Sequence, residues 1–396
     1  MIFAGDFAQL PPAIGGEAVS LYSPSLFQNA RSKFGQEQAI GQVAWHMVTS
    51  VVILRQNMRQ KEQTADDARF RTALENMRYK ACTPEDVQFL KSLIANQDDS
   101  RDSLNLTRFR DVAIITGLHT NRDVINEIGI ERFASERKLD LIEFFSEDTL
   151  VTEEDGVRRS QGASNKTEKQ SRVKLSRAVQ DLLWEQSPGT NSKKIAGKLR
   201  LCYGMPIILK YNFATELCMV NGQRATVVGW HDTFGTFGQR VLDTLFIHLT
   251  NPTKNVNIPN LPTNVVPVVK TTNKIQAMTP SGHTFTLSRQ QVEIAYDFAM
   301  TDYASQGYTR INNAVNLADL RTHQGYYMAL SRSSSARGTI IIQGFDHTKI
   351  VGRCSRALTR EFRELELLDE ISKRRYEGVL PLEVIGPTRR QMIHQF

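Results

Sequence analysis

Four short segments of this sequence combine residue types that suit contacts with phosphate groups. The first is Gly5–Pro12 (GDFAQLPP), which follows the apolar residues Ile2–Ala4. The apolar residues predict a buried strand, and the two prolines end it because proline cannot join a hydrogen-bonded ladder. A glutamine at the end of such a strand can hydrogen-bond a nucleotide phosphate or an attacking water. Gly5, Asp6 and Gln9 are therefore candidate nucleotide-binding residues; a plain turn is the alternative for Gly-Asp alone.

The second segment is Leu54–Gln60 (LRQNMRQ), which continues the apolar run Val51–Leu54. The run predicts a buried strand of an α/β sheet, so the arginines after it lie where a strand ends. An arginine there can stabilise charge on a transferring phosphoryl group through its forked guanidinium. Arg59 is therefore a candidate catalytic residue, and an ordinary surface ion pair is the alternative.

The third segment is Thr301–Gly307 (TDYASQG), which closes a strand predicted over 295–301. Backbone N–H groups are free at the end of a strand, and small or hydroxyl side chains suit contact with phosphate oxygens. Ser305, Gln306 and Gly307 are therefore candidates for phosphate contacts, and a simple loop is an equally good interpretation.

The fourth segment is Tyr326–Ser333 (YYMALSRS), in which an apolar stretch delivers a single arginine, Arg332, at a fixed position. Arg332 lies 26 positions after Gln306 (332 − 306). An Ala-Leu-Ser-Arg sequence is common in helices, so this signal alone is weak. The order of the four segments along the chain is more specific than any one of them.

A further polar segment follows the clearest strand of the sequence, predicted over 112–116. His119, Thr120 and Asn121 come directly before a helix that is expected to begin near Arg122. A strand, a short polar loop and a helix form one β-α unit. The loop suits contacts with nucleic-acid phosphates, and the alternative is that Thr120 or Asn121 caps the helix.

The elements that must position these segments follow from periodicity and turn residues. Helices are predicted over 66–79 and after Thr83, which precedes a proline as a helix cap does. The charged tail predicts a helix in which Leu358, Phe362, Leu365 and Leu368 recur at helical spacing. Residues 199–292 predict all-β structure with a tight turn at Asn221-Gly222. Strands are predicted over 206–210, 225–229, 245–249, 284–287, 295–301 and 339–343.

Composition allows two or three domains, because 396 residues with 40% hydrophobic content can bury sizeable cores. The net charge of +7 fits a polyanionic partner such as nucleic acid, and a merely basic protein is the alternative. Four scattered cysteines indicate reduced thiols of an intracellular protein, and no metal site is predicted because zinc-ligand spacing is absent. No apolar run approaches the ~18 residues of a membrane span, so no membrane partner is expected.

Together the segments resemble the late motifs of superfamily 1 DNA helicases, in the RecD-like branch that includes the Pif family and Helitron-type transposon helicases. Gly5–Pro12 is similar to the third motif, Leu54–Gln60 to the fourth, Ser305–Gly307 to the fifth and Ala329–Arg332 to the sixth. The stretches 203–209 and 217–228 look like the small β-barrel inserted in the family's second motor domain. The resemblance covers roughly 2–60, 110–128, 200–230 and 292–345.

The resemblance implies an enzyme that uses ATP and Mg²⁺ to unwind DNA in the 5′-to-3′ direction. Its partners would be single-stranded and forked duplex DNA, with roles in DNA repair, recombination and telomere maintenance, in the nucleus ahead of the mitochondrion. Gln9 would sense the γ-phosphate, Arg59 would reach it, and Arg332 would be the arginine finger. The implied nucleotide set is Gly5, Asp6, Gln9, Arg59, Gln306, Gly307 and Arg332, and the implied DNA set is His119, Thr120, Asn121, Ser305 and Gln306.

The sequence departs from the family in two respects. Tyr303 and Ala304 stand where His-Lys usually precedes Ser-Gln-Gly, so a cationic contact with the nucleic-acid backbone is missing. No GxxxxGK[ST] occurs, and the Asp-Glu pair that holds magnesium is expected upstream of residue 1. Without this loop nothing cradles the β- and γ-phosphates. We therefore expect a chain truncated before its third motif, which lacks ATPase activity by itself and needs an N-terminal motor half.

Two alternatives belong to other classes of function. A truncated remnant would bind single-stranded DNA without hydrolysing ATP. An unrelated DNA-binding module would place Gln9, Arg59 and Arg332 far apart, on no common site.

The implied fold is α/β, of the RecA-like P-loop NTPase type, with a complete second motor domain and only a C-terminal remnant of the first. A small β-barrel is expected as an insertion. The expected divisions are 1–50 for the remnant, 51–150 and 293–350 for the second motor domain, 151–198 for a flexible polar insertion, 199–292 for the barrel and 351–396 for the helical tail.

Overall fold

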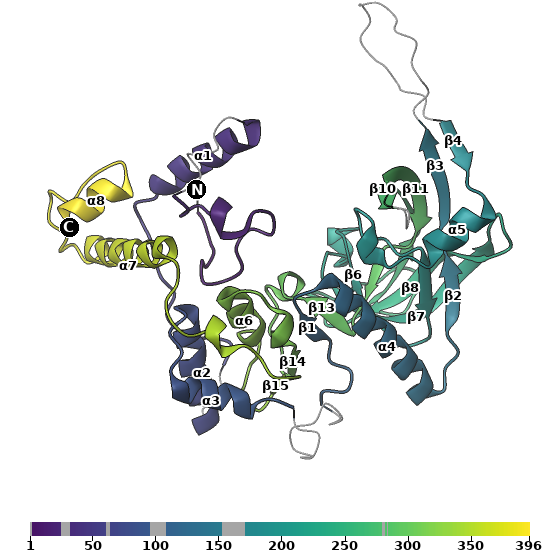
Figure 1. Cartoon of the computed structure of the whole chain (residues 1–396), viewed down its shortest axis with the longest axis horizontal. Coiled ribbons are helices and arrows are strands. Elements are labelled where there is room, and N and C mark those ends of the chain that lie inside the picture. Colours follow the sequence, from purple (N-terminus) through teal and green to yellow (C-terminus); the bar gives the residue numbers. More distant parts are fainter. Residues whose placement is uncertain are drawn as a thin grey trace, which may run out of the picture. The chain divides into compact units, whose positions relative to one another are not determined.

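The computed structural model describes residues 2–24, 32–60, 64–95, 108–152, 171–278, 282 and 284–396. The chain folds into two compact units (Figure 1). The split unit consists of Met1–Gly117 and Thr301–Phe396, and the β-rich unit consists of Leu118–Met300. Every predicted motif except the His119–Asn121 segment therefore belongs to the split unit.

A parallel sheet with helices packed around it forms the centre of the split unit. Ala314 pairs with both Ile114 and Ile340, which fixes the register of the three strands. Buried strands covered by helices are typical of α/β folds. The strands of this sheet that lie wholly within the split unit are β1 (Ile114–Thr116), β14 (Asn313–Val315) and β15 (Thr339–Ile341). The adjoining helices are α2 (Ala65–Arg78), α3 (Pro84–Ser92) and α6 (His323–Leu330). The predicted strands at 112–116 and 339–343 are confirmed in shortened form.

Local capping explains where α2 and α3 begin. The Thr64 and Thr83 hydroxyls each accept the N–H three residues later, and Asp67 and Asp86 complete both capping boxes. Such boxes satisfy N–H groups that have no partner in the first helical turn. The prediction of a capped helix at Thr83, with proline at its first position, is confirmed.

Helices from the two ends of the chain pack together through a buried arginine. Arg389 is 1% exposed and donates to Glu361 at 2.8 Å, and its guanidinium carbon lies 5.3 Å from the centre of the Trp45 ring. Trp45 in turn contacts Phe7 edge-on, with 5.4 Å between ring centres. Leu358 and Leu368 are buried, which confirms the predicted amphipathic tail. The helices are α1 (Lys33–His46), α7 (Arg356–Tyr376) and α8 (Arg389–Gln395).

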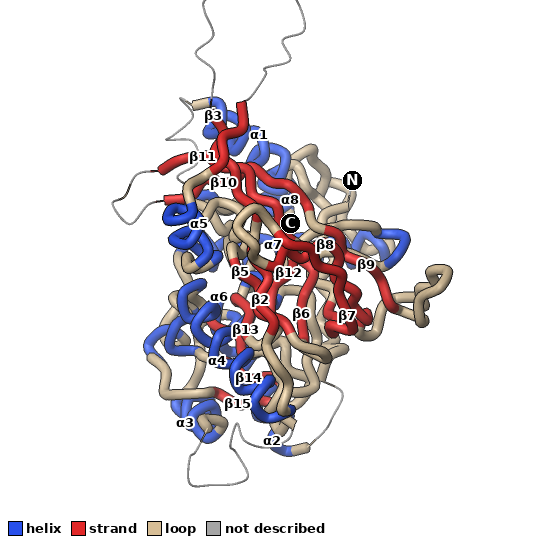
Figure 2. The backbone as a smooth tube through the Cα atoms, turned by 90° about the vertical axis from the view of Figure 1, so that its right-hand side faces the viewer, coloured by secondary structure: helices blue, strands red, loops and turns tan. Residues whose placement is uncertain are grey.

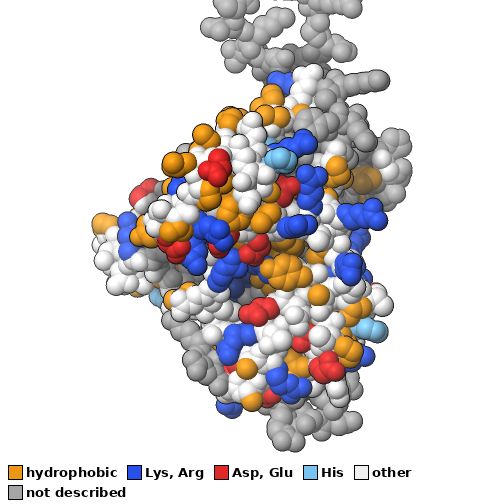
Figure 3. All heavy atoms as spheres, turned by 90° about the vertical axis from the view of Figure 1, so that its left-hand side faces the viewer, with side chains coloured by type: hydrophobic (Ala, Val, Ile, Leu, Met, Phe, Trp, Pro, Cys, Tyr) orange, Lys and Arg blue, Asp and Glu red, His pale blue; other side chains and the backbone are white. Residues whose placement is uncertain are grey.

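Charged side chains of both signs lie along α7. Figure 3 shows one face of the molecule, on which Lys and Arg lie among acidic and hydrophobic side chains. Pairs one helical turn apart on α7 account for part of the pattern, including Arg360–Glu364 and Arg374–Glu370, both at 2.8 Å. Exposed pairs of this kind contribute little stability, about 0.3–0.5 kcal/mol each.

The predicted strands over Ile2–Ala4 and Val51–Leu54 are wrong. Ile2 is 96% exposed, and Leu54 is 91% exposed, so neither segment is a buried core strand. The second segment runs along α7 instead, where the Ile53 N–H donates to Asp369 at 2.8 Å. No described strand pairs with either segment, and side chains of α7 accept the Val51 and Ile53 N–H groups instead.

Antiparallel sheets build the β-rich unit, as predicted for most of 199–292 (Figure 2). Five strands in the order β12-β6-β7-β8-β9 enclose much of its core. A second sheet has the order β10-β11-β3-β4, and β2 pairs with β5. The strands are β2 (Ile142–Phe145), β3 (Glu147–Thr152), β4 (Ser171–Lys174), β5 (Lys198–Leu201), β6 (Pro206–Leu209), β7 (Arg224–Phe234), β8 (Arg240–Leu249), β9 (Val265–Val269), β10 (Thr271–Met278), β11 (Thr284–Gln291) and β12 (Ile294–Tyr296).

Glycine supplies the turn between β6 and β7, as predicted at Asn221-Gly222. Gly222 has φ +88°, a left-handed conformation that strains residues with a Cβ. The predicted strand 295–301 is interrupted, because β12 ends at Tyr296 and β13 (Ala299–Thr301) is separate.

Part of the expected flexible insertion is folded. Residues 171–198 contain α5 (Arg177–Trp184), on which Leu183 and Trp184 are buried. The apolar residues at 182–184 therefore signalled a packed helix rather than a polar insertion. Residues 153–170 lie outside the described part of the chain.

Helix α4 (His119–Arg137) packs so closely on its neighbour that Gly129 leaves no room for a side chain. A Cβ at Gly129 would lie 2.4 Å from Cγ of Phe298, which is itself buried. We expect Gly129→Ala to destabilise the protein by about 1–2 kcal/mol, because overpacking outweighs the ~1 kcal/mol of helix propensity that alanine gains.

Urea unfolding measures this effect, and Gly41→Ala in α1 is the matched control. A Cβ at Gly41 meets only Leu21, at 3.9 Å, so the control is expected to be neutral or stabilising. Equal unfolding midpoints for Gly129→Ala and the wild type would contradict the close packing of α4 on Phe298.

Candidate functional site

The loop Gly5–Pro12 is fixed by a two-pronged ion pair with the last residue of α2. Arg78 Nη1 donates to Asp6 Oδ2 and Arg78 Nη2 lies against Asp6 Oδ1, both at 2.8 Å. Asp6 also accepts the Ala8 N–H at 3.0 Å, and Ala8 is fully buried. Asp6 thus anchors the loop. Gly5 is exposed, and a Cβ there would meet nothing within 4 Å.

Hydrogen bonds join this loop to segments nearly 300 positions later in the chain. They connect the candidate third motif to the candidate fifth motif and to the start of α6, so Gln9 and Gln306 meet directly. Gln9 is half-buried and Gln306 is exposed, so both amides remain accessible. The bonds are Tyr303 Oη to Pro11 O at 2.9 Å, Gln306 Nε2 to Gln9 Oε1 at 3.3 Å and Gln324 Nε2 to Phe7 O at 3.2 Å.

Arg59 and Arg332 form a second part of the same site. Arg332 is only 3% exposed and donates through Nε to Met328 O at 3.1 Å and through Nη2 to Ser331 Oγ at 3.0 Å. Arg59 Nη1 donates to Ser331 O at 2.8 Å, and its Nε donates to Thr309 Oγ1 at 3.1 Å. Both guanidinium groups therefore bind the same turn at the end of α6.

No carboxylate neutralises these two arginines within ion-pair distance among the described residues. The pKa of Arg332 is lowered to about 10, mainly by burial and in addition by the positive charge of Arg59. Two cations held together without a carboxylate partner among the described residues make a place where an anion is favoured.

Tyr327 links the anchor of the loop to the arginine pair. Burial raises the pKa of Tyr327, the charge of Asp6 raises it too, and Arg78 and Arg332 lower it. Asp6, Arg78, Tyr327, Arg332 and Arg59 thus form one polar cluster, here called the arginine cluster, in the split unit. The third motif thus contacts the fifth through Gln9 and Gln306, and the fourth contacts the sixth through Arg59 and the Ser331 carbonyl.

The candidate fifth motif contributes mainly backbone geometry. Ser305 is fully buried, and its hydroxyl donates to Asp302 O at 2.7 Å, so it is not offered to a ligand in this conformation. Gly307 is exposed with φ +88°, which a residue with a Cβ adopts only with strain. The expected contact of Ser305 with DNA is therefore unsupported, whereas Gln306 and Gly307 are accessible.

His119, Thr120 and Asn121 lie in the β-rich unit, within a helix rather than a loop. Helix α4 begins at His119, three residues before the predicted start, and its cap is Leu118. Neither Thr120 nor Asn121 is the helix cap, because both lie inside the helix. The cap residue, Leu118, makes no side-chain hydrogen bond. His119 and Thr120 are exposed on the first helical turn, where backbone N–H groups favour anions.

Basic side chains surround this helix start. Lys194 Nζ lies 2.6 Å from His119 Nε2, and Arg122 Nη1 lies 3.1 Å from His119 Nδ1. Lys210 Nζ donates to the Lys194 carbonyl at 2.6 Å. Asp123 is the nearby acid, and it is engaged by Arg122. We call His119, Arg122, Lys194 and Lys210 the lysine cluster.

The members of the lysine cluster depress each other's proton affinity. Burial lowers the pKa of Lys210 to about 8, Glu293 opposes this, and the charges of Arg122 and Lys194 add to it. Burial also lowers the pKa of His119, with Lys194 and Arg122 contributing. A phosphate placed here would relieve this repulsion.

Sequence reasoning missed Arg78, Gln324, Lys194 and Lys210. Each of these side chains takes part in the site through a contact between distant parts of the chain, so no local sequence pattern identifies it. The only available signal was indirect, since the net positive charge predicted basic side chains somewhere near a polyanion site.

No group of three or more His, Cys, Asp or Glu side chains that could hold a metal ion occurs among the described residues. In the same part of the chain, no helix is long and apolar enough to cross a membrane. Cys82, Cys202, Cys218 and Cys354 are all free thiols.

Solved structures of Pif1 helicases share this fold. The chain is similar to Pif1 helicase from Candida albicans with 16% identity and a TM-score of 0.54, covering 91% of this chain and 67% of that one. It is similar to Bacteroides Pif1 bound to single-stranded DNA with 14% identity and a TM-score of 0.53, covering 94% of this chain and 66% of that one. For Bacteroides Pif1 in complex with ADP-AlF3 and single-stranded DNA, the identity is 15% and the TM-score is 0.50. This match covers 95% of this chain and 67% of that one.

The fold of this chain is therefore that of a Pif1-type helicase, of mixed α/β class. The chain spans about two thirds of the length of these structures. No family model and no curated protein matches the sequence. At such low sequence identity, similarity to these structures establishes only the fold. The residue roles are therefore argued from the geometry described above.

The Asp6–Arg78 pair is expected to stabilise the loop measurably. A double-mutant cycle with Asp6→Asn and Arg78→Gln is expected to give a coupling free energy of about 0.5–3 kcal/mol, because both side chains are largely shielded from water. The free energies come from urea unfolding of the four proteins.

Arg374→Gln and Glu370→Gln form the control cycle. This exposed pair on α7 is expected to couple by about 0.3–0.5 kcal/mol only. A coupling between Asp6 and Arg78 no larger than the control would mean that the loop is not anchored by this ion pair.

Proposed function

We propose that this chain is the late-motif portion of a Pif-like, ATP-dependent DNA helicase. The observation that carries the proposal is the convergence of Asp6, Gln9, Arg59 and Arg332 in the split unit of a Pif1-type fold. This portion would bind the terminal phosphate of ATP on one side and single-stranded DNA on another. Its neighbours by fold include proteins solved with single-stranded DNA and with ADP-AlF3.

On the nucleotide side, the arginine cluster fits a phosphate group. Arg332 would act as the arginine finger and Arg59 would contact the γ-phosphate, because two guanidiniums that no described carboxylate neutralises can stabilise the charge that builds up during phosphoryl transfer. Gln9 would sense the γ-phosphate and pass its presence to Gln306 through their hydrogen bond. The described residues offer no carboxylate cluster for Mg²⁺, so we assign no metal ligand.

On the nucleic-acid side, the lysine cluster fits the DNA backbone. His119, Thr120 and Asn121 would contact one phosphate at the start of α4, and Lys194 and Lys210 would supply charge from the β-rich unit. Electrostatic contacts of this kind dominate affinity for single strands and carry little sequence preference. The substrate class is therefore single-stranded DNA, and forked DNA where the motor separates strands.

Hydrolysis and unwinding require a phosphate-binding loop, which none of these 396 residues supplies. We propose that a motor half carrying this loop completes the enzyme, with 5′-to-3′ unwinding as its output. In this proposal the split unit holds the second motor domain, and strands of the β-rich unit form its inserted barrel. A chromosomal substrate would place the protein in the nucleus or the mitochondrion.

A second candidate function is single-strand binding without catalysis. The observation that favours it is the missing phosphate loop together with an intact lysine cluster. The two candidates differ only in whether a separate motor half restores turnover.

The 396-residue chain by itself is expected to have no DNA-stimulated ATPase activity. Phosphate release from ATP, measured with and without single-stranded DNA, should equal the blank. Arg332→Ala is the control, because it removes the proposed arginine finger. Turnover well above the blank in the wild type, abolished in this variant, would contradict the prediction.

Single-stranded DNA binding is expected to depend on the lysine cluster. Lys194→Ala should weaken binding of an oligothymidylate and reduce the slope of log K against log salt by about 0.7, the change expected when one fewer phosphate is neutralised. Lys274→Ala is the matched control, since Lys274 is an exposed lysine on β10. Fluorescence anisotropy at several salt concentrations gives both quantities.

The same titrations at pH 7 and pH 9 test the chemistry of Lys210. A lysine with its pKa lowered to about 8 is mostly charged at pH 7 and mostly neutral at pH 9, so affinity should fall across this range. Lys210→Arg should remove most of that fall, because arginine stays charged.

For the salt titrations, a slope of log K against log salt that is unchanged in Lys194→Ala would refute the proposed DNA site.

A further inference from the structure

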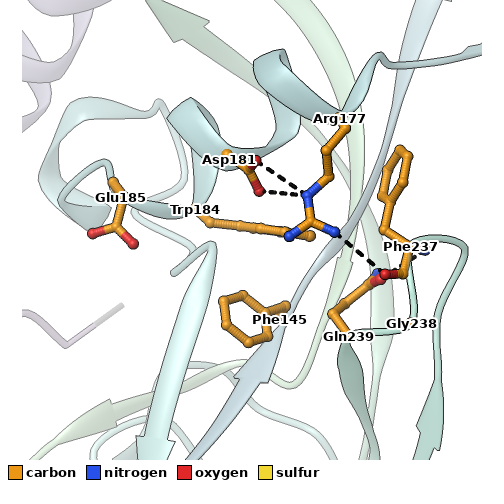
Figure 4. Close-up of a pocket in the computed structure, with 8 residues that line it drawn as sticks. All are labelled: Phe145, Arg177, Asp181, Trp184, Glu185, Phe237, Gly238 and Gln239. Atoms are coloured by element: carbon orange, nitrogen blue, oxygen red, sulfur yellow. Dashed lines mark hydrogen bonds and ion pairs between the residues drawn. The ribbon is translucent and has the colours of Figure 1, made fainter.

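A pocket of about 410 Å³ lies in the β-rich unit, apart from both clusters described above. Helix α5 forms one wall, the end of β2 forms another, and the turn between β7 and β8 closes it (Figure 4). This volume falls in the range of small-ligand sites, and one amino-acid side chain fits within it. The lining residues are Phe145, Arg177, Asp181, Trp184, Glu185, Phe237, Gly238 and Gln239.

Three aromatic rings make the pocket a cage. The Phe145 and Trp184 ring centres are 4.7 Å apart, and those of Trp184 and Phe237 are 6.5 Å apart with the rings nearly perpendicular. Trp184 is 4% exposed, and its indole N–H donates to Ser146 O at 3.0 Å. The cage wall is therefore held rigidly by burial and a hydrogen bond.

The chain's own Arg177 occupies this cage. Its guanidinium carbon lies 5.5 Å from the centre of the Trp184 ring and 5.7 Å from that of Phe237. Arg177 Nε donates to both carboxylate oxygens of Asp181, at 2.9 and 3.1 Å, and Nη1 donates to Phe237 O at 3.3 Å. Rings, carboxylate and carbonyl together satisfy a guanidinium (Figure 4).

Arg177 is nevertheless poorly held for a residue in such a site. Its side chain is 56% exposed, and it is the first residue of α5, so the side chain can swing into solvent without disturbing the helix. Exposed pairs such as Arg177–Asp181 contribute only about 0.3–0.5 kcal/mol. Another guanidinium could therefore replace it at little cost.

The charges around the pocket favour a cation and disfavour a nucleotide. Asp181 is paired with Arg177, and Glu185 is paired with Lys198 at 2.8 Å. Glu143 lies 3.8 Å from the same lysine and 3.9 Å from Arg200, so its charge is balanced outside the pocket. Of the charged residues that line the pocket, two are carboxylates, Asp181 and Glu185, and one is a cation, Arg177. A phosphate bound here would meet acidic side chains whose counter-ions are already engaged.

We propose that this pocket is a docking site for an arginine side chain of a partner protein, which displaces Arg177 from the aromatic cage. The partner's guanidinium would stack between Trp184 and Phe237 and take over the bond to Asp181. Arginine is favoured over lysine because its planar group stacks on rings and matches a carboxylate with two donors. The proposal is independent of the function proposed above.

The test uses the full chain with acetyl-arginine-amide as the probe. Tryptophan is replaced by 5-fluorotryptophan, and the ¹⁹F signal of Trp184 is assigned with Trp184→Phe. The probe is expected to shift the Trp184 signal in a saturable way. Arg177→Ala should tighten binding by about threefold or more, because the competing side chain is gone.

Matched variants and probes make the outcome decisive. Arg374→Ala removes an exposed arginine with the same kind of contacts, to Glu370 and Phe396, and should leave probe binding unchanged. Asp181→Asn should weaken binding in the Arg177→Ala background, and acetyl-lysine-amide should bind more weakly than the arginine probe. Equal affinity in the wild type and Arg177→Ala would overturn the proposal. So would a Trp184 shift caused by oligothymidylate and not by the arginine probe.

Discussion

The ion pair between Asp6 and Arg78 is the contact on which the arrangement of the arginine cluster depends. It holds the Gly5–Pro12 loop at the end of α2, and the loop then meets Gln306 and Gln324 from the other half of the split unit. Because the two halves are separated in sequence by the whole β-rich unit, no local interaction could set this geometry. A charge-assisted, two-pronged bond supplies both orientation and strength where the backbone alone supplies neither.

The two clusters share one electrostatic principle. Each holds several cations close together without enough carboxylates, and in each the buried member, Arg332 or Lys210, has a lowered pKa. Folding tolerates this repulsion only because neighbouring carbonyls and hydroxyls accept hydrogen bonds from the same groups. Sites built in this way favour anions, and the proposed function assigns a nucleotide phosphate to one cluster and a nucleic-acid backbone to the other.

Sequence reasoning succeeded where local rules decide the structure and failed where tertiary context does. The helix cap at Thr83, the turn at Gly222 and the spacing of Leu358 and Leu368 needed only neighbouring residues, and all were predicted. The apolar run at Val51–Leu54 has the composition of a core strand, yet it lies along α7 with Leu54 in solvent. For the site, motif order indicated Gln9, Arg59 and Arg332, whereas Arg78 and Lys210 could not be found because their partners are remote.

The packing of Arg389 against Trp45 has a consequence for how variants of this protein are interpreted. Trp45 contacts both Phe7 and the Arg389 guanidinium, so the final helix supports the loop that carries Gln9. A substitution in α8 would then reproduce the phenotype of one in the loop, although it contacts no ligand. Genetic data that map a loss of activity to α8 would therefore identify indirect support of the loop through Trp45, not a second active site.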